Sequence, residues 1–183
     1  GTSAYVMHER SEEAMAYNLA RGDYDKRKEK CSPATPAILP GMESKQPPSR
    51  ITLAKWLVRA DNPLSARVTV NRFWQELFGT GIVRTSGDFG VAGELPSNQA
   101  LLDWMAVDFR EHNWDIKRFF KQLVTSAAYR QSSAITAEKR MKDPGNRLIS
   151  RGPRFRMDAE MVRDYALEVS GLLVKTIGGP SVK

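Results

Sequence analysis

The sequence of 183 residues contains a single cysteine, Cys31, and two histidines, His8 and His112. One cysteine excludes an internal disulfide, a zinc site built from paired cysteines and a C-x-x-C-H haem attachment. Two histidines far apart in the sequence do not make up a His-based metal centre, so we expect no metal site. Cys31 lies in a polar segment without a neighbouring base, which favours an unreactive thiol.

Motifs for nucleophilic and phosphate chemistry are also missing. The chain has no G-x-S-x-G nucleophile elbow and no H-E-x-x-H zinc motif. Residues 79–81 (G-T-G) follow a predicted helix rather than a strand, so they do not match a dinucleotide-binding loop. Residues 88–90 (D-F-G) have the letters of the kinase magnesium motif, but no H-R-D motif precedes them. The sequence therefore provides no catalytic residue, and we expect no cofactor in this chain.

Long apolar runs are absent as well. No stretch approaches the ~20 consecutive apolar residues that a membrane-spanning helix needs, and the chain contains no secretory signal pattern. A hydrophobic content of 41%, with four Trp and seven Phe, is instead typical of a folded protein. We expect a globular protein without a membrane span, long enough to bury one sizeable core.

The net charge of +7 is unevenly distributed. Residues 1–50 contain eight basic and seven acidic residues, a net charge of +1. Residues 139–156 contain seven basic residues and one acidic residue, a net charge of +6. Nearly all of the excess therefore lies on one segment, which permits an acidic partner without requiring one.

Residues 1–50 are predicted to form an extended N-terminal segment, and residues 51–183 a helical domain. Residues 4–7 are a strand candidate, and residues 12–19 fit either a strand or a helical turn. Residues 21–50 contain five prolines and clustered charge. Because proline removes a backbone donor and disfavours helix in the residue before it, this stretch is interpreted as an extended linker.

Five amphipathic helices are predicted after this segment. Ser49 is expected to cap the first. Asn62 is expected to cap the second, with Pro63 at its first position, and Gly79 to end it. The apolar face of the first helix contains Ile51, Leu53, Ala54, Leu57 and Val58, with Trp56 near its edge. The tryptophans Trp56, Trp74, Trp104 and Trp114 are interpreted as core or helix-junction residues.

The last three helices are expected to begin after Ser97, Asp115 and Asp158. The final helix carries an apolar stripe at helical spacing, which is predicted to be buried. This stripe consists of Met161, Val162, Tyr165, Ala166, Val169 and Leu172. The predicted fold class is therefore mainly α, an orthogonal bundle of about five amphipathic helices with an extended N-terminal segment that has room for short β-structure.

A series of strings along the chain resembles one family, in the same order. The most informative is N-P-L-S-A-R-V-T-V-N-R-F-W-Q-E-L-F-G-T-G-I-V-R-T-S-G-D-F-G at residues 62–90. Other strings are R-G-D-Y-D (21–25), P-A-I-L-P (36–40), W-D-I-K-R-F-F-K-Q-L (114–123), D-P-G-N-R-L (143–148), R-F-R-M-D-A-E-M-V-R-D (154–164) and G-G-P-S-V (178–182). Together they resemble the planctomycete-specific domain, a domain of unknown function that follows cytochrome c-like modules in large exported proteins.

The resemblance carries expectations about context. It implies an exported or periplasmic location, with any signal peptide upstream of this chain. It also implies that haem would be held only by separate modules of the parent protein. Members of the family usually continue past G-G-P-S-V, so we expect this chain to be a fragment of a longer polypeptide. The resemblance implies no reaction.

One group of polar residues surrounds the turn after the second predicted helix. It comprises Arg67, Asn71, Arg72, Arg84 and Asp88. In a structural interpretation, Arg67 pairs with Asp88 or Asp103, and Asn71 satisfies backbone groups of the glycine-rich loop. In a functional interpretation, the three arginines form an anion clamp with Asp88 as acid or base. We favour the structural interpretation.

The basic segment at residues 139–156 also has two interpretations. Its arginines Arg147, Arg151, Arg154 and Arg156 could contact phosphates, with Phe155 stacking on a base. Only one aromatic is present, however, and no known nucleic-acid recognition motif accompanies it. We therefore favour internal ion pairs or a contact with the rest of the parent protein over nucleic acid.

The missing catalytic motifs favour a non-catalytic interaction or scaffold domain in a multidomain exported protein. Its expected partners are other domains of the same polypeptide or separate proteins. One alternative is an enzyme or binding module that recognises an anionic substrate, such as a sulfated or carboxylated glycan, through the Arg/Asp cluster. Another is the binding of a polyanion or nucleic acid through residues 139–156.

Overall fold

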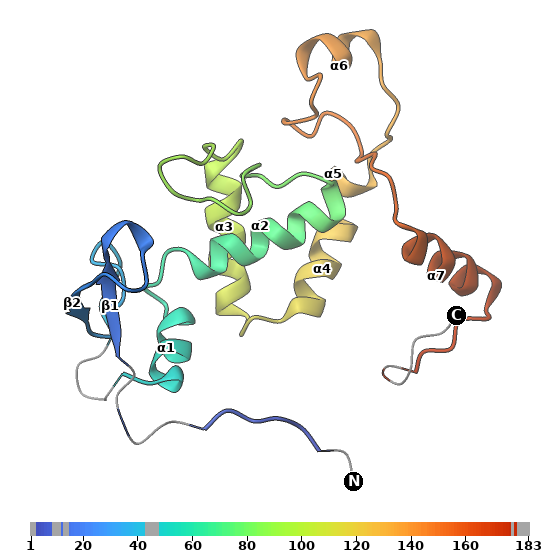
Figure 1. Cartoon of the computed structure of the whole chain (residues 1–183). Helices are drawn as coiled ribbons and strands as arrows, with labels where there is room; N and C mark the ends of the chain where they lie inside the picture. The colour runs from blue at the N-terminus through green and yellow to red at the C-terminus, as the bar shows by residue number, and fades with distance from the viewer. Residues whose placement is uncertain (1–2, 9–11, 13–14, 43–47, 177, 179–183) are drawn as a thin grey trace.

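The computed structural model describes residues 3–8, 12, 15–42, 48–176 and 178, and it is mainly helical, as predicted (Figure 1). The N-terminal elements are β1 (Ala16–Leu19), a 3-10 turn η1 (Ala20–Gly22) and β2 (Arg27–Cys31). The helices are α1 (Arg50–Leu57), α2 (Ser65–Phe78), α3 (Gln99–Glu111), α4 (Ile116–Thr125), α5 (Ala127–Arg130), α6 (Ala137–Lys142) and α7 (Ala159–Ser170). The described part thus holds seven helices rather than five, because α5 and α6 are too short to show a periodic pattern.

The hydrophobic core lies where α2 crosses α3 and α4 (Figure 1). Along one face of α2, every fourth residue is buried. Side chains that are four residues apart lie one above another on a helix. Rings from three elements fill the centre, with Phe109 and Phe119 at a centroid distance of 5.2 Å. The buried apolar residues of this core are Ala66, Val70, Trp74, Phe78, Ile82, Val83, Leu102, Met105, Ala106, Phe109, Phe119 and Leu123.

Capping residues set most of the helix boundaries where they were predicted. The Ser49 hydroxyl accepts from the backbone N–H of Thr52, as predicted. Asp115 and Asp158 cap α4 and α7 in the same way. The predicted start of the second helix was wrong by two positions: Asn62 accepts from the N–H of Leu64 at 3.0 Å, but α2 begins at Ser65, with Leu64 rather than Asn62 at the cap position. The predicted cap at residue 97 was wrong by one position, because the side chain that accepts from Leu101 belongs to Asn98.

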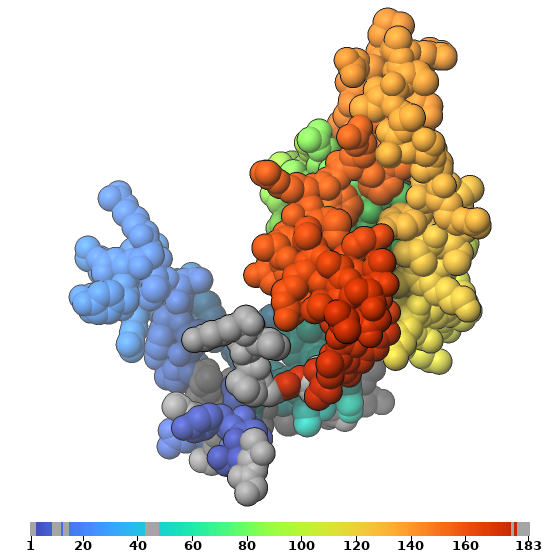
Figure 2. Space-filling view, turned by 90° about the vertical axis from the view of Figure 1, so that its right-hand side faces the viewer, coloured from blue at the N-terminus to red at the C-terminus, as the bar shows by residue number. Residues whose placement is uncertain are grey.

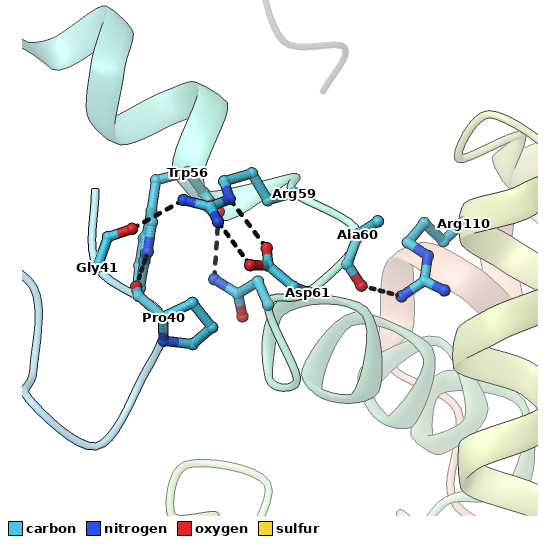
Figure 3. A network of polar contacts seen from close by, with 8 residues as sticks. Pro40, Gly41, Trp56, Arg59, Ala60, Asp61 and Arg110 are labelled. Carbon is cyan, nitrogen blue, oxygen red and sulfur yellow. Dashed lines mark hydrogen bonds and ion pairs between the residues drawn. The ribbon is translucent and has the colours of Figure 1, made fainter. Parts of the chain in front are cut away.

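The predicted apolar face of α1 is not buried. Trp56, expected at its edge, is the residue of this helix that packs inward, with 7% of its surface exposed. Its indole Nε1 donates to the carbonyl of Pro40, and the Arg59 guanidinium reaches the carbonyl of Gly41 at 2.7 Å (Figure 3). Arg110 of α3 donates to the carbonyl of Ala60 at 2.6 Å (Figure 3). These polar contacts connect α1 to the segment before it and to the core after it.

The N-terminal segment contains a two-stranded hairpin. Residues 16–19 form β1, so the open choice for residues 12–19 is decided in favour of a strand for these four residues, while residues 12 and 15 lie outside it. β2 lies inside the stretch interpreted as a linker, and it pairs antiparallel with β1 through Ala16–Cys31 and Tyr17–Lys30. Residues 4–7, the other strand candidate, are not in a strand. The side chains of β1 and β2 are mostly exposed and polar. The sequence therefore lacks the alternation of apolar and polar residues that would predict a hairpin.

Residues 132–152, which include most of the basic segment, leave the helical core, form α6 and return to it. We call this stretch the basic excursion. The excursion begins and ends at one point, because the N–H of Gly152 donates to the carbonyl of Ser132 at 3.0 Å. The amide of Gln131 closes the same junction by donating to the carbonyl of Ile149. Gly152 is required here, since a Cβ atom would lie 2.6 Å from the carbonyl oxygen of Gln131. Figure 1 shows the excursion projecting beyond the end of α2.

The predicted burial of the final helix was wrong. α7 follows Asp158 as expected, but it contains no buried residue. It stands apart from α2, α3 and α4 in Figure 1, and nothing covers it in the view of Figure 2. The periodic stripe is present, because the sequence pattern reports which residues share a face. The pattern cannot report whether the described part of the chain supplies a surface against that face.

No helix within the described ranges has both the length and the apolar character that crossing a bilayer would require.

Candidate functional site

Asn71 is the centre of the polar group that follows α2. Its side chain is fully buried, with 0% of its surface exposed. The amide Nδ2 donates to the carbonyl of Val83 at 3.0 Å, and Oδ1 accepts from the N–H of Val83 at 2.9 Å. Nδ2 also lies 3.3 Å from the Ser86 hydroxyl, which in turn bonds Gln75. One side chain therefore satisfies both backbone groups of a loop residue that has no strand partner.

Gly81 makes this arrangement sterically possible. A Cβ atom at this position would lie 2.5 Å from the carbonyl oxygen of Val83 and 2.7 Å from Nδ2 of Asn71. The G-T-G string, set aside as a phosphate-binding loop, thus contains a glycine that lets the backbone approach Asn71. The sequence gives its spacing but no indication of this close approach.

The rest of the loop is stabilised by its own side chains. The Thr85 hydroxyl donates to the carbonyl of Asp88 and accepts from the N–H of Glu94 at 2.9 Å. The carboxylate of Asp88 accepts from the N–H of Gly90 at 2.7 Å. Gly93 is another close approach, since a Cβ atom there would meet the carbonyl of Asp88 at 2.2 Å. Asp88 is exposed, and in this structure it supports a turn.

Arg67 points to α3 rather than to the loop. Its Nε donates to the carboxylate of Asp103 at 2.6 Å, and Nη1 donates to the carbonyl of Pro63 at 2.6 Å. Of the two partners proposed from the sequence, the structure therefore selects Asp103. The hydrogen bond from Arg67, followed by one from Gln99, lowers the pKa of Asp103. Its carboxylate therefore stays ionised to a lower pH than an aspartate without these partners.

Arg72 and Arg84 complete the candidate anion cluster, and both are exposed. Neither makes a hydrogen bond or an ion pair with another described residue. Arg67 thus bonds α3, and Asn71 bonds the loop at Val83. Asp88 supports its own turn, and the other two arginines extend into solvent. An anion-binding role for Arg67, Asn71, Arg72, Arg84 and Asp88 stays a prediction.

The basic segment contains a second polar centre around Asp143, a buried acid. Its carboxylate accepts from the N–H of Arg147 at 2.7 Å and of Leu148 at 3.1 Å. Burial acts to raise the pKa of Asp143, but these backbone donors together with hydrogen bonds from Ser150 outweigh burial, and the net effect lowers the pKa. Asn146, in the left-handed region with φ of 51°, donates to the carbonyl of Arg151 at 3.0 Å. The D-P-G-N string is therefore a turn built around its own side chains.

The four arginines of the candidate basic surface have different environments. Arg151 is buried, with 8% of its surface exposed, and donates to the carbonyls of Asp143 and Pro144 at 2.8 Å each. Arg147 is exposed and forms an ion pair with Glu94 at 3.3 Å. Arg154 and Arg156 are exposed and have no polar partner among the described residues. Binding of a polyanion by these residues stays a prediction.

The α7 surface was missed as a candidate site because its stripe was expected to be core. We define it as the exposed apolar residues Met161, Val162, Tyr165, Val169 and Leu172, of which Val162 is 54% and Val169 72% exposed. Residues 173–176 lie beside the helix and enclose with it an open groove of about 730 Å³. Along one edge run the acidic residues Glu160, Asp164 and Glu168, spaced four apart.

Metal chemistry has no obvious location in the described ranges. Among residues 3–8, 12, 15–42, 48–176 and 178, no three His, Cys, Asp or Glu side chains come close enough together to hold a metal ion.

Comparison with known families gives one match. Residues 49–183 match the model of the family PSD1, described as a protein of unknown function (DUF1553). No curated protein and no solved structure matches the chain. The match covers all the helices α1 to α7 and leaves the hairpin of β1 and β2 outside it.

Proposed function

We propose that this chain, which belongs to the PSD1 family of proteins of unknown function, is a non-catalytic protein-interaction domain whose docking element is the α7 surface. The observation that carries the proposal is the exposure of an amphipathic helix. α7 has the periodic apolar face of a packed helix, yet none of its residues is buried. A contiguous apolar surface of this kind on a folded protein typically marks a site of association.

The partner's chemistry follows from the edge of α7. Residues 158–170 contain four acidic residues and one basic residue, a net charge of −3. Glu168 is paired with Lys175 at 2.9 Å, and Asp164 with Arg163 at 3.6 Å. Glu160 is the acid of this edge that has no ion pair among the described residues, and the exposed Asp164 can exchange Arg163 for a partner's cation. Complementary charge orients a partner and speeds its association. The partner we propose is a protein with an apolar groove, bordered on one side by lysine or arginine.

The sequence resemblance supports the wider context of this proposal. In our proposal, the domain belongs to a multidomain exported protein with separate modules that hold haem, the context that this resemblance implies. The partner groove would then belong to another domain of that polypeptide or to a protein in the same compartment. The α7 surface would contribute binding and no reaction of its own.

Photo-crosslinking tests the docking role directly. A photoreactive residue is placed at Val169 of the full protein in its native host, and a matched one at Val91, which is fully exposed on a loop. We expect a discrete crosslinked protein from Val169 and none from Val91. Equal yields from both positions, or crosslinks from Val169 to this domain's own core, would contradict the proposal.

Charge reversal tests the partner's chemistry. The pair of changes Glu160→Lys and Asp164→Lys is expected to lower the Val169 crosslink yield roughly threefold to tenfold, because exposed ion pairs contribute little each. The matched change Glu111→Lys, on the exposed end of α3, should leave the yield unchanged. A product with twice the mass of the protein would show that a second copy occupies the α7 surface, which would overturn the proposed heterologous partner.

A further inference from the structure

A cavity of about 360 Å³ lies where α2 ends against the basic excursion. Three parts of the chain form its wall: residues 78–80 at the end of α2, Ile135, and the residues 144–146 and 151–155. We infer that this end cavity binds a small organic anion, a carboxylate or sulfate attached to a compact ring. The inference is independent of the α7 surface and goes beyond the proposed docking function.

The first observation is a buried positive charge without a counter-ion. Arg151 lines the cavity and is more than nine-tenths buried, yet its guanidinium donates to neutral acceptors, the carbonyls of Asp143 and Pro144 and the Ser150 hydroxyl. Within the described residues it forms no ion pair with a carboxylate. The nearby carboxylate of Asp143 is already bonded by backbone N–H groups. Buried charges in proteins are normally paired, so an anion from outside would complete this site.

The hydrogen bonds of Arg151 do not use all of its donors. Nη1 and Nη2 are engaged, while Nε makes no hydrogen bond to a described residue. No fully buried polar side-chain atom in the described part of the chain lacks a partner, so Nε is not completely enclosed, and in our inference it is the donor that an anion in the cavity reaches. The carbonyls that hold the guanidinium fix its plane, which prepares it to bind an anion without further ordering.

A second cation lines the same cavity. Arg154 is exposed and has no polar partner in the described ranges, so its long side chain can close over a bound anion. Two guanidinium groups, one fixed and one free to move, suit a carboxylate or sulfate because each offers planar, paired donors. Arg156, two residues further on, is exposed as well but does not line the cavity.

Apolar side chains in the rest of the wall can pack against a compact ring. Phe78 stacks on Trp74 with a ring-centroid distance of 3.9 Å, which holds its ring in place. Phe155 is 45% exposed and packs over Gly79, where a Cβ atom would lie 3.2 Å from it. Ile135 and Pro153 complete this side. A volume of about 360 Å³ lies at the lower end of the range for small-molecule sites, so a single ring with one anionic group fits.

Calorimetric titration of the whole chain tests the inference. The probes are benzoate, an aromatic carboxylate, and galacturonate, a sugar carboxylate, with benzyl alcohol and galactose as their neutral counterparts. We expect at least one anion to bind and its neutral counterpart not to bind. Tighter binding of benzoate would show that the ligand carries an aromatic ring, and tighter binding of galacturonate that it carries a sugar ring.

Three variants locate the binding site. Arg154→Gln should weaken binding about tenfold, the value of one charged hydrogen bond. Arg156→Gln makes the same charge change outside the cavity and should leave the dissociation constant within about twofold. Gly145→Leu should abolish binding by filling the cavity, since a Cβ atom at this position meets only Cγ of Arg147 at 3.7 Å and needs no backbone rearrangement.

The outcomes are decisive in either direction. No heat from either anion up to about 50 mM, equal binding of anion and neutral counterpart, or equal weakening by Arg154→Gln and Arg156→Gln would overturn the inference. Chemical-shift changes confined to Gly79, Gly145 and Gly152 during the titration would confirm the location. None of these results bears on crosslinking at α7, so the two proposals can fail separately.

Discussion

At the scale of single residues, Asn71 determines the conformation of the loop that follows α2. Its amide takes the place of a strand partner for Val83, with both hydrogen bonds buried. A buried backbone donor or acceptor that loses its partner costs about 1–3 kcal/mol. The conformation of the loop at Val83 therefore depends on one amide group.

The change Asn71→Ala is expected to lower the free energy of unfolding by about 2–4 kcal/mol, because it leaves two buried backbone groups of Val83 without partners. Urea denaturation monitored by tryptophan fluorescence gives this quantity. The neighbouring change Arg72→Ala, at an exposed position of the same helix, should stay within about 0.5 kcal/mol. Similar losses for both variants would show that Asn71 acts only through helix propensity.

Gly81 provides a separate test of the same loop. Gly81→Ala is expected to destabilise the protein by about 1–3 kcal/mol, since the added methyl group would overlap the carbonyl of Val83. The matched change Gly87→Ala adds a methyl group where no atom lies within 4 Å. Thermal unfolding of the two variants should show a lower midpoint for Gly81→Ala alone. An unchanged midpoint would mean that the backbone at residue 81 moves without cost.

At the scale of elements, the helices differ in how much of their apolar face is covered. Met105 of α3 has 2% of its surface exposed, whereas Met161 of α7 has 44%. Met105→Ala is expected to cost about 2–5 kcal/mol through the cavity it leaves. Met161→Ala should cost less than about 0.5 kcal/mol in the isolated chain. Denaturation curves of the two variants measure the difference, and comparable losses would place α7 in the core.

The contact between α3 and α4 includes an ion pair that should respond to acid. The carboxylate of Asp108 accepts from Arg118 at 2.7 and 3.1 Å, and this hydrogen bonding lowers the pKa of Asp108 from its usual 3.8. A pKa lowered by folding stabilises the protein above pH 3.8, and this stabilisation is lost as pH falls through the lower folded value. Asp108→Asn should therefore be less stable than the wild type at pH 7.

The pH dependence of that difference is the test. Unfolding free energies of the wild type and of Asp108→Asn are measured from pH 7 downward. The two curves should converge as the pH falls through the lowered pKa of Asp108, where the wild-type carboxyl becomes protonated and its charge-dependent advantage is lost. A gap that is constant with pH would show that the side chain contributes through packing alone.

Sequence patterns predicted the elements whose determinants are local. Ser49, Asp115 and Asp158 cap the helices they were expected to cap, because the hydroxyl or carboxylate bonds a backbone N–H only two or three residues away. Gly79 ends α2 with φ of 77°, again a local property. Burial depends on distant parts of the chain, so the apolar stripe of α7 was assigned to the core and Trp56 to the edge of a face.

The same distinction explains the candidate sites. The sequence suggested that Arg67 pairs with an acid and that Asn71 satisfies the loop, since both roles follow from residue chemistry. It grouped Arg147, Arg151, Arg154 and Arg156 as one basic surface, although the structure buries Arg151 among carbonyls. Net charge along a segment does not reveal which arginine lies inside, so the end cavity could not be predicted.

At the scale of the whole molecule, Trp56 connects the N-terminal segment to the helical core. Trp56→Phe keeps an aromatic ring but removes the donor to Pro40, so the free energy of unfolding should fall by about 0.5–1.5 kcal/mol. The matched change Trp104→Phe, at a position with 54% of its surface exposed, should have a smaller effect. Guanidinium titration followed by circular dichroism compares them. A larger loss for Trp104→Phe would contradict this assignment.

The closed junction between Ser132 and Gly152 has a consequence for how relatives of this protein can diverge. Because the chain departs and returns at neighbouring atoms, insertions or deletions between these two positions leave the paths of α2, α3 and α4 untouched. Ile135, Pro144 and Gly145 lie within this interval and form part of the end cavity. Evolution can therefore vary the length of this stretch, and with it the preferred small molecule, while the helical scaffold is inherited intact.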